Sequence, residues 1–424
     1  MFPEHADVRG RPRVAITGMG VITPAGETLD AFYANVHRGL GLAGPVTRFD
    51  ADDLPTRIAC EVHGFDPTDY LSLKDVRRLD PFARFAVAAA LRAVEDAGAP
   101  RGDPYRRGVV CGTALGGHHT IAEQALACAS KGPLRVSGFL APMGMDNSPA
   151  AAISARLGWL GPSLTVNTAC AAGATAIGEA VRWIRSGDCD TVLAGGTDAG
   201  VNRLVMAAFS RLRALSRRND EPERASRPFD KARDGYVMGE GAAFLVLERL
   251  DVAARWGARV YAEVAGYGHT SDAYHPTAPL PDGTQAARCM RLALADAGLD
   301  PSDIGHVNAH GTGTRLNDAM EATALTAVFG QAPPPVTAPK GVLGHLMGAA
   351  GAAEAVVAAL SARDGLVPPV ANHEDGDPEH PLDIVTVAPR RVRPGAAVLS
   401  NSFGFGGHNA GLVIAPHRLE VAEP

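Results

Sequence analysis

Residues 164–187 have the sequence LTVNTACAAGATAIGEAVRWIRSG, and the rest of the chain can be interpreted outward from them. The apolar and β-branched run at 164–170 predicts a strand. The next residues, 171–187, are small and apolar at helical spacing and end at Gly187, a residue type that commonly terminates helices. A strand that leads directly into a helix is the repeating unit of α/β proteins.

The same alternation continues on both sides of this unit. Strands are predicted at 13–24, 106–117, 191–200, 242–250, 258–268, 306–314, 336–340, 397–407 and 410–416. Helices are predicted at 81–97, 283–299, 317–330 and 345–365. Strands alternating with helices imply an α/β fold whose sheets are covered by helices, and the similar rhythm of the two parts of the chain fits a duplication.

Length and composition limit the class of protein. The chain has 424 residues, of which 46% are hydrophobic and 20% charged. These values exclude wholesale disorder and leave room for two or three domains or one large duplicated domain. The net charge of −6 argues against a general nucleic-acid binder, which usually carries a basic surface. Residues 1–12 are polar and mixed in charge, so we expect a flexible tail and no signal peptide.

The cysteines and the apolar runs indicate a cellular location. The six cysteines form no C-x-x-C pair and no cluster with zinc spacing. Scattered cysteines in a large chain indicate reduced thiols. No apolar run approaches the roughly 18 residues that a membrane span needs. We therefore expect a soluble, cytoplasmic protein that has no metal site and contacts no membrane.

Cys170 is the sharpest candidate for chemistry. It ends the predicted strand and opens the predicted helix. The positive end of a helix dipole favours the thiolate, which predicts a lowered thiol pKa. The alternative is a small buried core residue, a common fate of free cysteines.

Two histidines and a lysine lie in other glycine-rich segments. His310 is in NAHGTGT, His345 is in KGVLGHLMGAAG, and Lys340 is one of four lysines in the chain. Glycine lets the backbone and a ligand approach each other closely. A cysteine with two such histidines fits covalent catalysis by a nucleophile and imidazole groups. Taken singly, each histidine could equally be a core or surface group, and Lys340 a surface charge.

The segment NSFGFGG at 401–407 is either a tight hairpin or a source of backbone N–H groups for an oxyanion. It is not a dinucleotide-binding fingerprint, because no G-x-G-x-x-G joins a strand to a helix before an acidic residue. The chain also has no P-loop and no G-x-S-x-G nucleophile elbow.

Four separated motifs together resemble the β-ketoacyl-acyl-carrier-protein synthase family. They are VNTACAAGA, VNAHGTGT, KGVLGHLMGAAGAAE and NSFGFGGHN, and the resemblance extends over about 13–416. It is strongest to the elongating Cys-His-His branch, which includes the ketosynthase subunits of type II polyketide systems. The resemblance implies a thiolase-like fold, with two duplicated halves stacked as five α-β-α-β-α layers. We place the halves at 13–255, with Cys170, and at 256–424, with His310, Lys340 and His345.

The resemblance also implies a reaction. Cys170 would take an acyl chain from a carrier protein, and malonyl-carrier protein would then lose its carboxylate and attack the Cys170 thioester. His310 and His345 would donate Nε2–H to the malonyl thioester oxygen. The backbone N–H groups of Cys170 and Phe403 would form the second oxyanion hole, and Phe403 would also act as a gate. No cofactor is needed by the chain itself, because phosphopantetheine arrives on the carrier protein.

Further roles follow from the same resemblance. Lys340 would organise the hydrogen bonds around His345. The residues expected to support the site are Asp318, Glu321, Glu354 and Asn401, and a structural monovalent cation near Asn308 and Glu354 is compatible with the pattern. Leu115 and His408 would lie at the acyl pocket. The basic residues expected to dock the acidic carrier protein are Lys74, Arg77, Arg78 and Arg213; for each, the alternative is a solvated surface charge.

The sequence departs from the family pattern at a few positions. His408 stands where the family usually has threonine, and GTGTRLND at 311–318 resembles polyketide-type synthases more than fatty-acid ones. These departures favour a polyketide pathway. The family is dimeric, so we expect a homodimer or a heterodimer with a chain-length-factor-like subunit, with the segment near 135–170 close to the partner.

Other readings stay open beside the ketosynthase. A non-catalytic chain-length factor would lack the nucleophile that Cys170 provides. A thiolase would need a second catalytic cysteine, and the C-terminal half offers none in a matching glycine-rich setting. A Cys-His-Asn priming synthase would have asparagine in place of His345. A purely structural protein is the remaining alternative.

Overall fold

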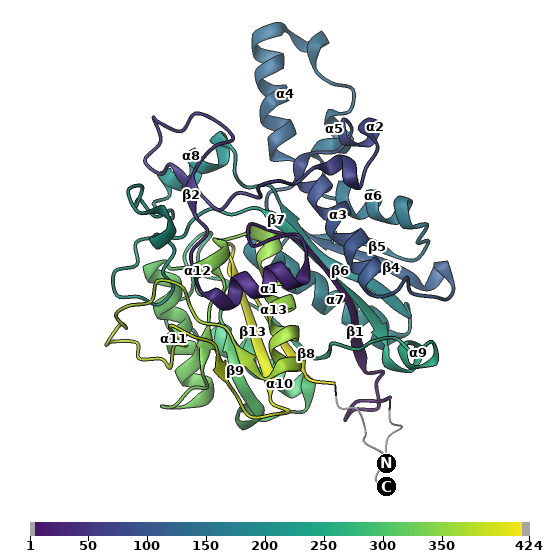
Figure 1. The fold of residues 1–424 in the computed structure, drawn as a ribbon, viewed down its shortest axis with the longest axis vertical. Coiled ribbons are helices and arrows are strands. Elements are labelled where there is room, and N and C mark those ends of the chain that lie inside the picture. The colour runs from purple at the N-terminus through teal and green to yellow at the C-terminus, as the bar shows by residue number, and fades with distance from the viewer. Residues whose placement is uncertain (1–4, 418–424) are drawn as a thin grey trace.

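The computed structural model describes residues 5–417 and contains a continuous ten-stranded sheet (Figure 1). The strands from the first part of the chain are β1 (Val14–Ile22), β4 (Arg107–Gly112), β5 (Ser163–Val166), β6 (Thr191–Asp198) and β7 (Gly241–Arg249). Those from the second part are β8 (Ala262–Ser271), β9 (Ile304–Asn308), β10 (Val336–Thr337), β13 (Ala397–Gly404) and β14 (His408–Ala415).

The two parts of the sheet have the same topology. From one edge the order is β5-β4-β6-β7-β1, and from the other edge it is β10-β9-β13-β14-β8. In both, the two outer pairings are parallel and the two inner pairings are antiparallel. The half-sheets meet where β1 pairs with β8 at Ala15↔Glu263 and Ile16↔Ala262. This repeat confirms the duplication predicted from the rhythm of strands and helices.

Helices form three further layers around the half-sheets. Helix α3 (Pro81–Asp96) packs on the outer face of the first half-sheet, with α6 (Ser148–Leu157) beside it. Helix α10 (Thr284–Ala297) packs on the outer face of the second half-sheet, with α11 (Arg315–Phe329) beside it. Helices α7 (Ala172–Ser186) and α13 (Ala350–Asp364) contact each other and both half-sheets. The order of layers is therefore α-β-α-β-α, as the family resemblance implies.

Shorter elements complete the fold. The helices are α1 (Leu29–Arg38), α2 (Leu73–Val76), α4 (His118–Lys131), α5 (Leu140–Gly144), α8 (Arg203–Arg211), α9 (Leu250–Arg255) and α12 (Lys340–Leu343). The short strands are β2 (Gly44–Pro45), β3 (Ile58–Ala59), β11 (Leu366–Val367) and β12 (Arg390–Arg391). Within residues 5–417, no helix is long and apolar enough to cross a membrane.

Glycines in the two central strands let the outer helices approach closely. A Cβ atom on Gly20 in β1 would lie 2.1 Å from the carbonyl oxygen of Ala89 in α3. A Cβ atom on Gly268 in β8 would lie 2.1 Å from the carbonyl oxygen of Cys289 in α10. A strand glycine thus permits the same close approach of an outer helix at equivalent places in the two halves. The duplication therefore extends to the packing of helix on strand.

The two central helices also meet through glycine. A Cβ atom on Gly173 in α7 would lie 2.8 Å from the backbone nitrogen of Ala352 in α13. A Cβ atom on Gly351 would lie 2.8 Å from the backbone nitrogen of Ala174. Because neither contact leaves room for a side chain, the N-terminal ends of α7 and α13 are held side by side. This crossing determines where residues from the two halves can meet.

The N-terminal segment differs in part from the expected tail. Residues 1–4 lie outside the described chain, but Ala6 pairs with Pro12, and Arg11 forms an ion pair of 2.7 Å with Asp296 in α10. The segment from residue 5 onward is therefore packed against the second half. The boundary proposed at 255/256 falls between α9 and β8 and stays a prediction.

We expect Gly20→Ala to lower the free energy of unfolding by about 1–3 kcal/mol, because the new methyl group forces α3 away from β1. Chemical denaturation monitored by circular dichroism measures this change. Gly138→Ala is the matched control, since a Cβ atom there meets nothing within 4 Å. Equal stabilities of the two variants would contradict the close approach of α3 to β1.

Candidate active site

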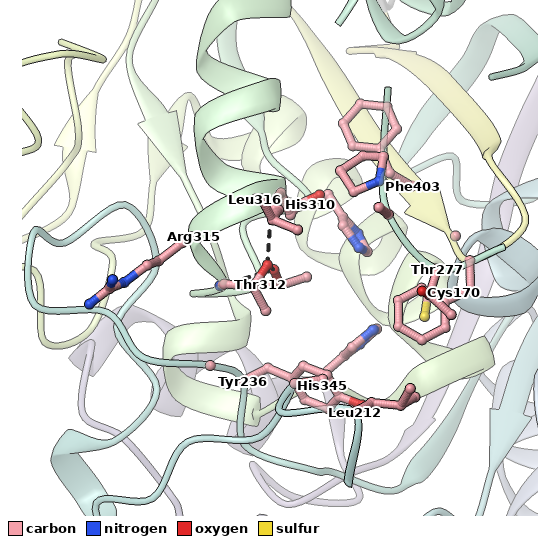
Figure 2. A pocket seen from close by; sticks show the side chains of 18 of the residues that line it. Cys170, Leu212, Tyr236, Thr277, His310, Thr312, Arg315, Leu316, His345 and Phe403 are labelled. Carbon is pink, nitrogen blue, oxygen red and sulfur yellow. Dashed lines mark hydrogen bonds between the residues drawn. The ribbon is translucent and has the colours of Figure 1, made fainter. Parts of the chain in front are cut away.

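A cavity of about 320 Å³ brings together the residues that the sequence singled out. Its lining includes Cys170, His310, His345 and Phe403, which come from four segments in the two halves of the chain. Figure 2 shows ring nitrogens of both histidines directed toward the space beside the Cys170 sulfur. The cavity is therefore the candidate active site.

Cys170 lies at the junction between β5 and α7. It belongs to one turn of 3-10 helix, Ala169–Ala171, directly before α7. The preceding Ala169 has φ of +50°, a conformation that costs energy for a residue other than glycine. A Cβ atom on Gly404 would lie 2.4 Å from the carbonyl oxygen of Thr168. The glycine thus lets the loop after β13 approach the cysteine closely.

The thiol of Cys170 is protonated in the resting protein. Burial raises its pKa to about 12, against the opposing effects of the Lys340 charge and of backbone N–H groups of Phe405 and Cys170. The lowered pKa predicted from the helix terminus is therefore wrong, because loss of solvation outweighs the helix dipole and the nearby cation. The cysteine must lose its proton when it attacks a substrate.

Lys340 is buried in the interior of the protein, with 1% of its surface exposed, and donates hydrogen bonds to three acceptors. Its Nζ atom lies 2.6 Å from the carbonyl oxygen of His310, 3.1 Å from Nδ1 of His310 and 2.5 Å from Oε1 of Glu354. An ammonium has three donors and all three are used. Because Nδ1 of His310 accepts a hydrogen bond, its ring proton is on Nε2. The expected partner was His345, so that assignment is wrong.

His345 is held in an extended segment instead of the helix predicted over 345–365. Its backbone N–H donates to Val237 at 2.8 Å, and its carbonyl accepts from Gly239 at 2.9 Å. Helix α13 begins only at Ala350. The ring lies 5.5 Å from the His310 ring, centre to centre. The extended backbone directs the imidazole into the cavity.

Both imidazoles are neutral. Burial, the Lys340 charge and His345 lower the pKa of His310 well below its usual value. Burial and the Lys340 charge lower the pKa of His345 in the same direction. Neutral imidazoles donate hydrogen bonds without adding charge, so the pair suits a substrate oxygen that becomes negative during reaction.

Acidic side chains support the histidine-bearing turn. Glu321 accepts hydrogen bonds of 2.8 Å from the backbone N–H groups of both His310 and Gly311, and Asn401 lies 3.4 Å from it. Asp318 accepts from the backbone of Phe229 at 2.8 Å. Burial raises the pKa of Glu321 to about 7 and that of Glu354 to about 7. The structure thus places the four expected supporting residues around His310 and Lys340.

Three oxygen atoms near this network are buried without a hydrogen-bond partner. They are Oδ1 of Asn308, Oε2 of Glu354 and Oδ1 of Asn401. Oxygen donors of this kind fit the monovalent cation considered from the sequence. No cluster of three or more histidine, cysteine or acidic side chains that could hold a metal occurs within residues 5–417.

The backbone next to the Cys170 sulfur is that of Phe405 and not that of Phe403. Phe403 is in β13, paired with Asn409 of β14, and its ring lies 5.8 Å from the His310 ring. The backbone N–H directed at the Cys170 sulfur belongs to Phe405. The Phe405 ring lies 6.1 Å from the Phe209 ring, centre to centre. The two phenylalanines of NSFGFGG are two residues apart, and the motif alone does not distinguish them.

The two residues expected at the acyl pocket have different positions. Leu115 packs in the apolar cluster that contains Cys170, Met206 and Met238. His408 is absent from the lining of the cavity and lies beside His269 instead. Burial lowers the pKa of His269, and the nearby His408 lowers it further. Neither residue lines the cavity, and their roles at the acyl pocket stay predictions.

The basic residues expected to dock a carrier protein are all exposed. Lys74 and Arg77 are in and directly after α2, and Arg78 stacks on the Phe139 ring at 4.6 Å. Arg213 lines the mouth of the cavity. Arg315, which the sequence analysis did not single out, also lines it. Its signal in the sequence is its place in GTGTRLND, directly after the glycine turn of His310.

A duplicated α/β fold with a buried cysteine and two neutral histidines in one cavity defines a cysteine-dependent condensing acyltransferase. Residues 11–253 match the family described as β-ketoacyl synthase, N-terminal domain, and 261–374 match its C-terminal domain. The chain belongs to the β-ketoacyl synthase family and is an acyltransferase of the β-ketoacyl-acyl-carrier-protein synthase type.

Relatives and solved structures agree with this assignment. The chain is 43% identical to 3-oxoacyl-[acyl-carrier-protein] synthase 2 of Synechocystis, over 96% of this chain and 99% of that protein. It is 41% identical to the protein of the same name in Coxiella burnetii, over 95% and 98% of the two chains. The structure is similar to "The ishigamide ketosynthase/chain length factor", with a TM-score of 0.90, 39% identity, and coverage of 96% and 100%.

We expect alkylation of Cys170 by iodoacetamide to speed up about tenfold per pH unit between pH 7 and 9, because only the thiolate reacts and the thiol pKa lies above this range. Intact-protein mass spectrometry follows the adduct in a Cys128→Ser background, which removes the exposed cysteine. A rate that levels off below pH 8 would show that the thiol pKa is lowered after all.

Proposed function

We propose that this protein is an elongating ketosynthase that condenses an acyl chain on Cys170 with malonyl-acyl carrier protein, extending the chain by two carbons in type II polyketide biosynthesis. The observation that carries the proposal is the meeting of Cys170, His310 and His345 on one buried cavity. Malonyl thioesters need oxyanion donors for decarboxylation, and an acyl thioester needs a nucleophile.

The first half-reaction loads the acyl chain. The sulfur of Cys170 attacks the thioester carbonyl of the acyl-carrier protein, and its proton leaves with the pantetheine thiol. The carbonyl oxygen gains negative charge in this step. The backbone N–H groups of Cys170 and Phe405, which face the sulfur, stabilise it without reorganisation. Because burial raises the thiol pKa, only a small fraction of Cys170 is thiolate before substrate binds.

The second half-reaction makes the carbon–carbon bond. The malonyl thioester oxygen accepts hydrogen bonds from Nε2–H of His310 and from His345, and carbon dioxide leaves. The resulting carbanion attacks the carbonyl carbon of the Cys170 thioester, the carbon–sulfur bond breaks, and the Cys170 sulfur leaves as a thiolate that regains a proton. Lys340 fixes the His310 tautomer that donates from Nε2. Its hydrogen bond to Glu354 balances the buried charge. Both histidines act as neutral donors, as enolate stabilisation requires.

An acyl carrier protein is the proposed substrate carrier. Arg213 and Arg315 line the mouth of the cavity and form no ion pair within the described chain. Lys74, Arg77 and Arg78 add positive charge on the surface. Basic residues around a cavity mouth attract an acidic partner even on a protein of negative net charge. The phosphopantetheine of the carrier supplies the thiol, so the ketosynthase itself needs no organic cofactor.

A second subunit is proposed to cover the edge of the sheet. Strand β5 has a neighbour on one side only. Exposed apolar side chains gather near it and on the segment from α4 to α5, which projects from the body in Figure 1. They are Ile121, Leu126, Leu134, Phe139, Met145, Leu160 and Leu164. Exposed apolar surface beside an open strand is typical of an interface. The partner is a second copy or a chain-length-factor-like subunit.

The polyketide assignment is the finer part of the proposal. The relatives named above are 3-oxoacyl-carrier-protein synthases, whereas solved neighbours include a type II polyketide complex titled with its acyl-carrier protein and a bound hexaketide, at 30% identity. The GTGTRLND segment favours the polyketide type. A catalytic half of a heterodimer is the second candidate. A thiolase is less well supported, because among the six cysteines, all within residues 5–417, only Cys170 lines the cavity.

Cys170→Ala is expected to abolish both acyl transfer and condensation, because no other thiol can hold the chain. Intact mass spectrometry with acyl-carrier protein, followed by malonyl-carrier protein, measures the adduct and its disappearance. Condensation by the variant would refute the proposal. An adduct that persists in the unaltered protein alone would identify the need for a partner subunit, which addition of a chain-length factor then tests.

His345→Ala is expected to acylate Cys170 normally but to release carbon dioxide from malonyl-carrier protein about 10²–10³-fold more slowly, the usual effect of removing one oxyanion donor. Radiolabelled malonyl groups allow the release to be measured. His269→Ala, at an exposed histidine outside the cavity, is the control and should leave the rate unchanged. A normal rate in His345→Ala would remove His345 from the decarboxylation step.

A further inference from the structure

The hydroxyl group of Tyr236 is buried in the active-site cavity with no hydrogen-bond partner. The side chain lines the cavity and is 4% exposed. Its Oη atom accepts from and donates to nothing within the described chain. Buried polar groups in folded proteins nearly always have a partner, and an unpaired one is costly. A phenylalanine would fill the same space without that cost, so the hydroxyl points to a ligand atom that pairs with it.

The ring is held firmly beside the catalytic groups. The backbone of Tyr236 donates to Ala214 at 3.0 Å and accepts from Ser216 at 2.9 Å. The ring meets the His345 ring edge to face at 5.1 Å, and Figure 2 shows the two side by side. Tyr236 also belongs to the apolar cluster that contains Cys170. The phenol therefore lies in the same cavity as the Cys170 sulfur and beside the His345 ring.

Helix α8 carries two more unpaired polar atoms, on residues that lie outside the lining of the cavity. Asn202, Met206 and Ser210 are spaced four residues apart at the start of and along α8, so they share one face of the helix. Met206 packs in the cluster with Cys170 and Tyr236. Nδ2 of Asn202 and Oγ of Ser210 are buried without partners.

We infer that Tyr236 donates a hydrogen bond from Oη to an oxygen on C3 of the acyl chain held by Cys170, so that the enzyme selects 3-oxoacyl or 3-hydroxyacyl chains over saturated ones. The inference rests on the proposed ketosynthase function. Each condensation leaves an oxygen on C3, and this is the first chain oxygen beyond the thioester. The carboxylate of the malonyl group is a poorer partner for the phenol than the C3 oxygen. A hydrogen bond to this carboxylate would stabilise the malonyl group before decarboxylation and so slow that step.

The test compares acylation of Cys170 by octanoyl, 3-hydroxyoctanoyl and 3-oxooctanoyl groups on one acyl carrier protein. In the unaltered protein the two oxygenated chains load faster than octanoyl. Tyr236→Phe is expected to slow the oxygenated chains about tenfold relative to octanoyl, the usual effect of one lost hydrogen bond. The variant keeps the ring and removes an unpaired group, so its unfolding midpoint should not fall.

Tyr261→Phe is the matched control. Its hydroxyl donates to Asp96 at 3.0 Å, outside the cavity, and its loss should leave the chain preference unchanged. Equal rates for the three chains in the unaltered protein, or equal slowing of all three in Tyr236→Phe, overturn the inference alone. If Tyr236→Phe releases carbon dioxide more slowly but keeps its chain preference, the phenol acts on the malonyl group, and this result also overturns the inference. No acyl adduct from any chain overturns the proposed function and this inference with it.

Discussion

The charge of Lys340 is the interaction on which the site depends. A buried ammonium is costly unless every proton is paired, and here the three protons reach the backbone and ring of His310 and the carboxyl of Glu354. This one group selects the His310 tautomer, adds to the effect of burial that keeps both imidazoles neutral, and lowers the Cys170 pKa against burial. A mobile or exposed lysine would do none of these reliably, because solvent would screen its charge.

The position of that charge depends in turn on the crossing of two helices. Gly173 and Gly351 let α7 and α13 touch backbone to backbone. Cys170 precedes α7, and Lys340 and His345 precede α13, so the crossing brings a nucleophile from one half to a charge and an imidazole from the other. The duplicated fold supplies two equivalent helix ends, and the differing loops before them give the two ends different chemistry.

Burial has opposite consequences for different groups in this cavity. It holds the Cys170 thiol in its unreactive form and the histidines in their donor form, since in each case the charged state is the one that loses solvation. The same dryness makes each backbone N–H and imidazole donor more effective toward a developing oxyanion. The unpaired phenol of Tyr236 lies in the same water-poor cavity, where a hydroxyl group without a hydrogen-bond partner is costly.

The sequence by itself determined the alternation of strands and helices, the duplication, and the identity of Cys170, His310, Lys340 and His345, because these depend on local periodicity and on short glycine-flanked motifs. It did not determine that Lys340 pairs with His310, that Phe405 and not Phe403 faces the sulfur, or that His408 lies outside the cavity. It also predicted the wrong direction for the Cys170 pKa. Those properties depend on which side chains meet across the two halves and on how much water the packing excludes, and only the tertiary structure decides them.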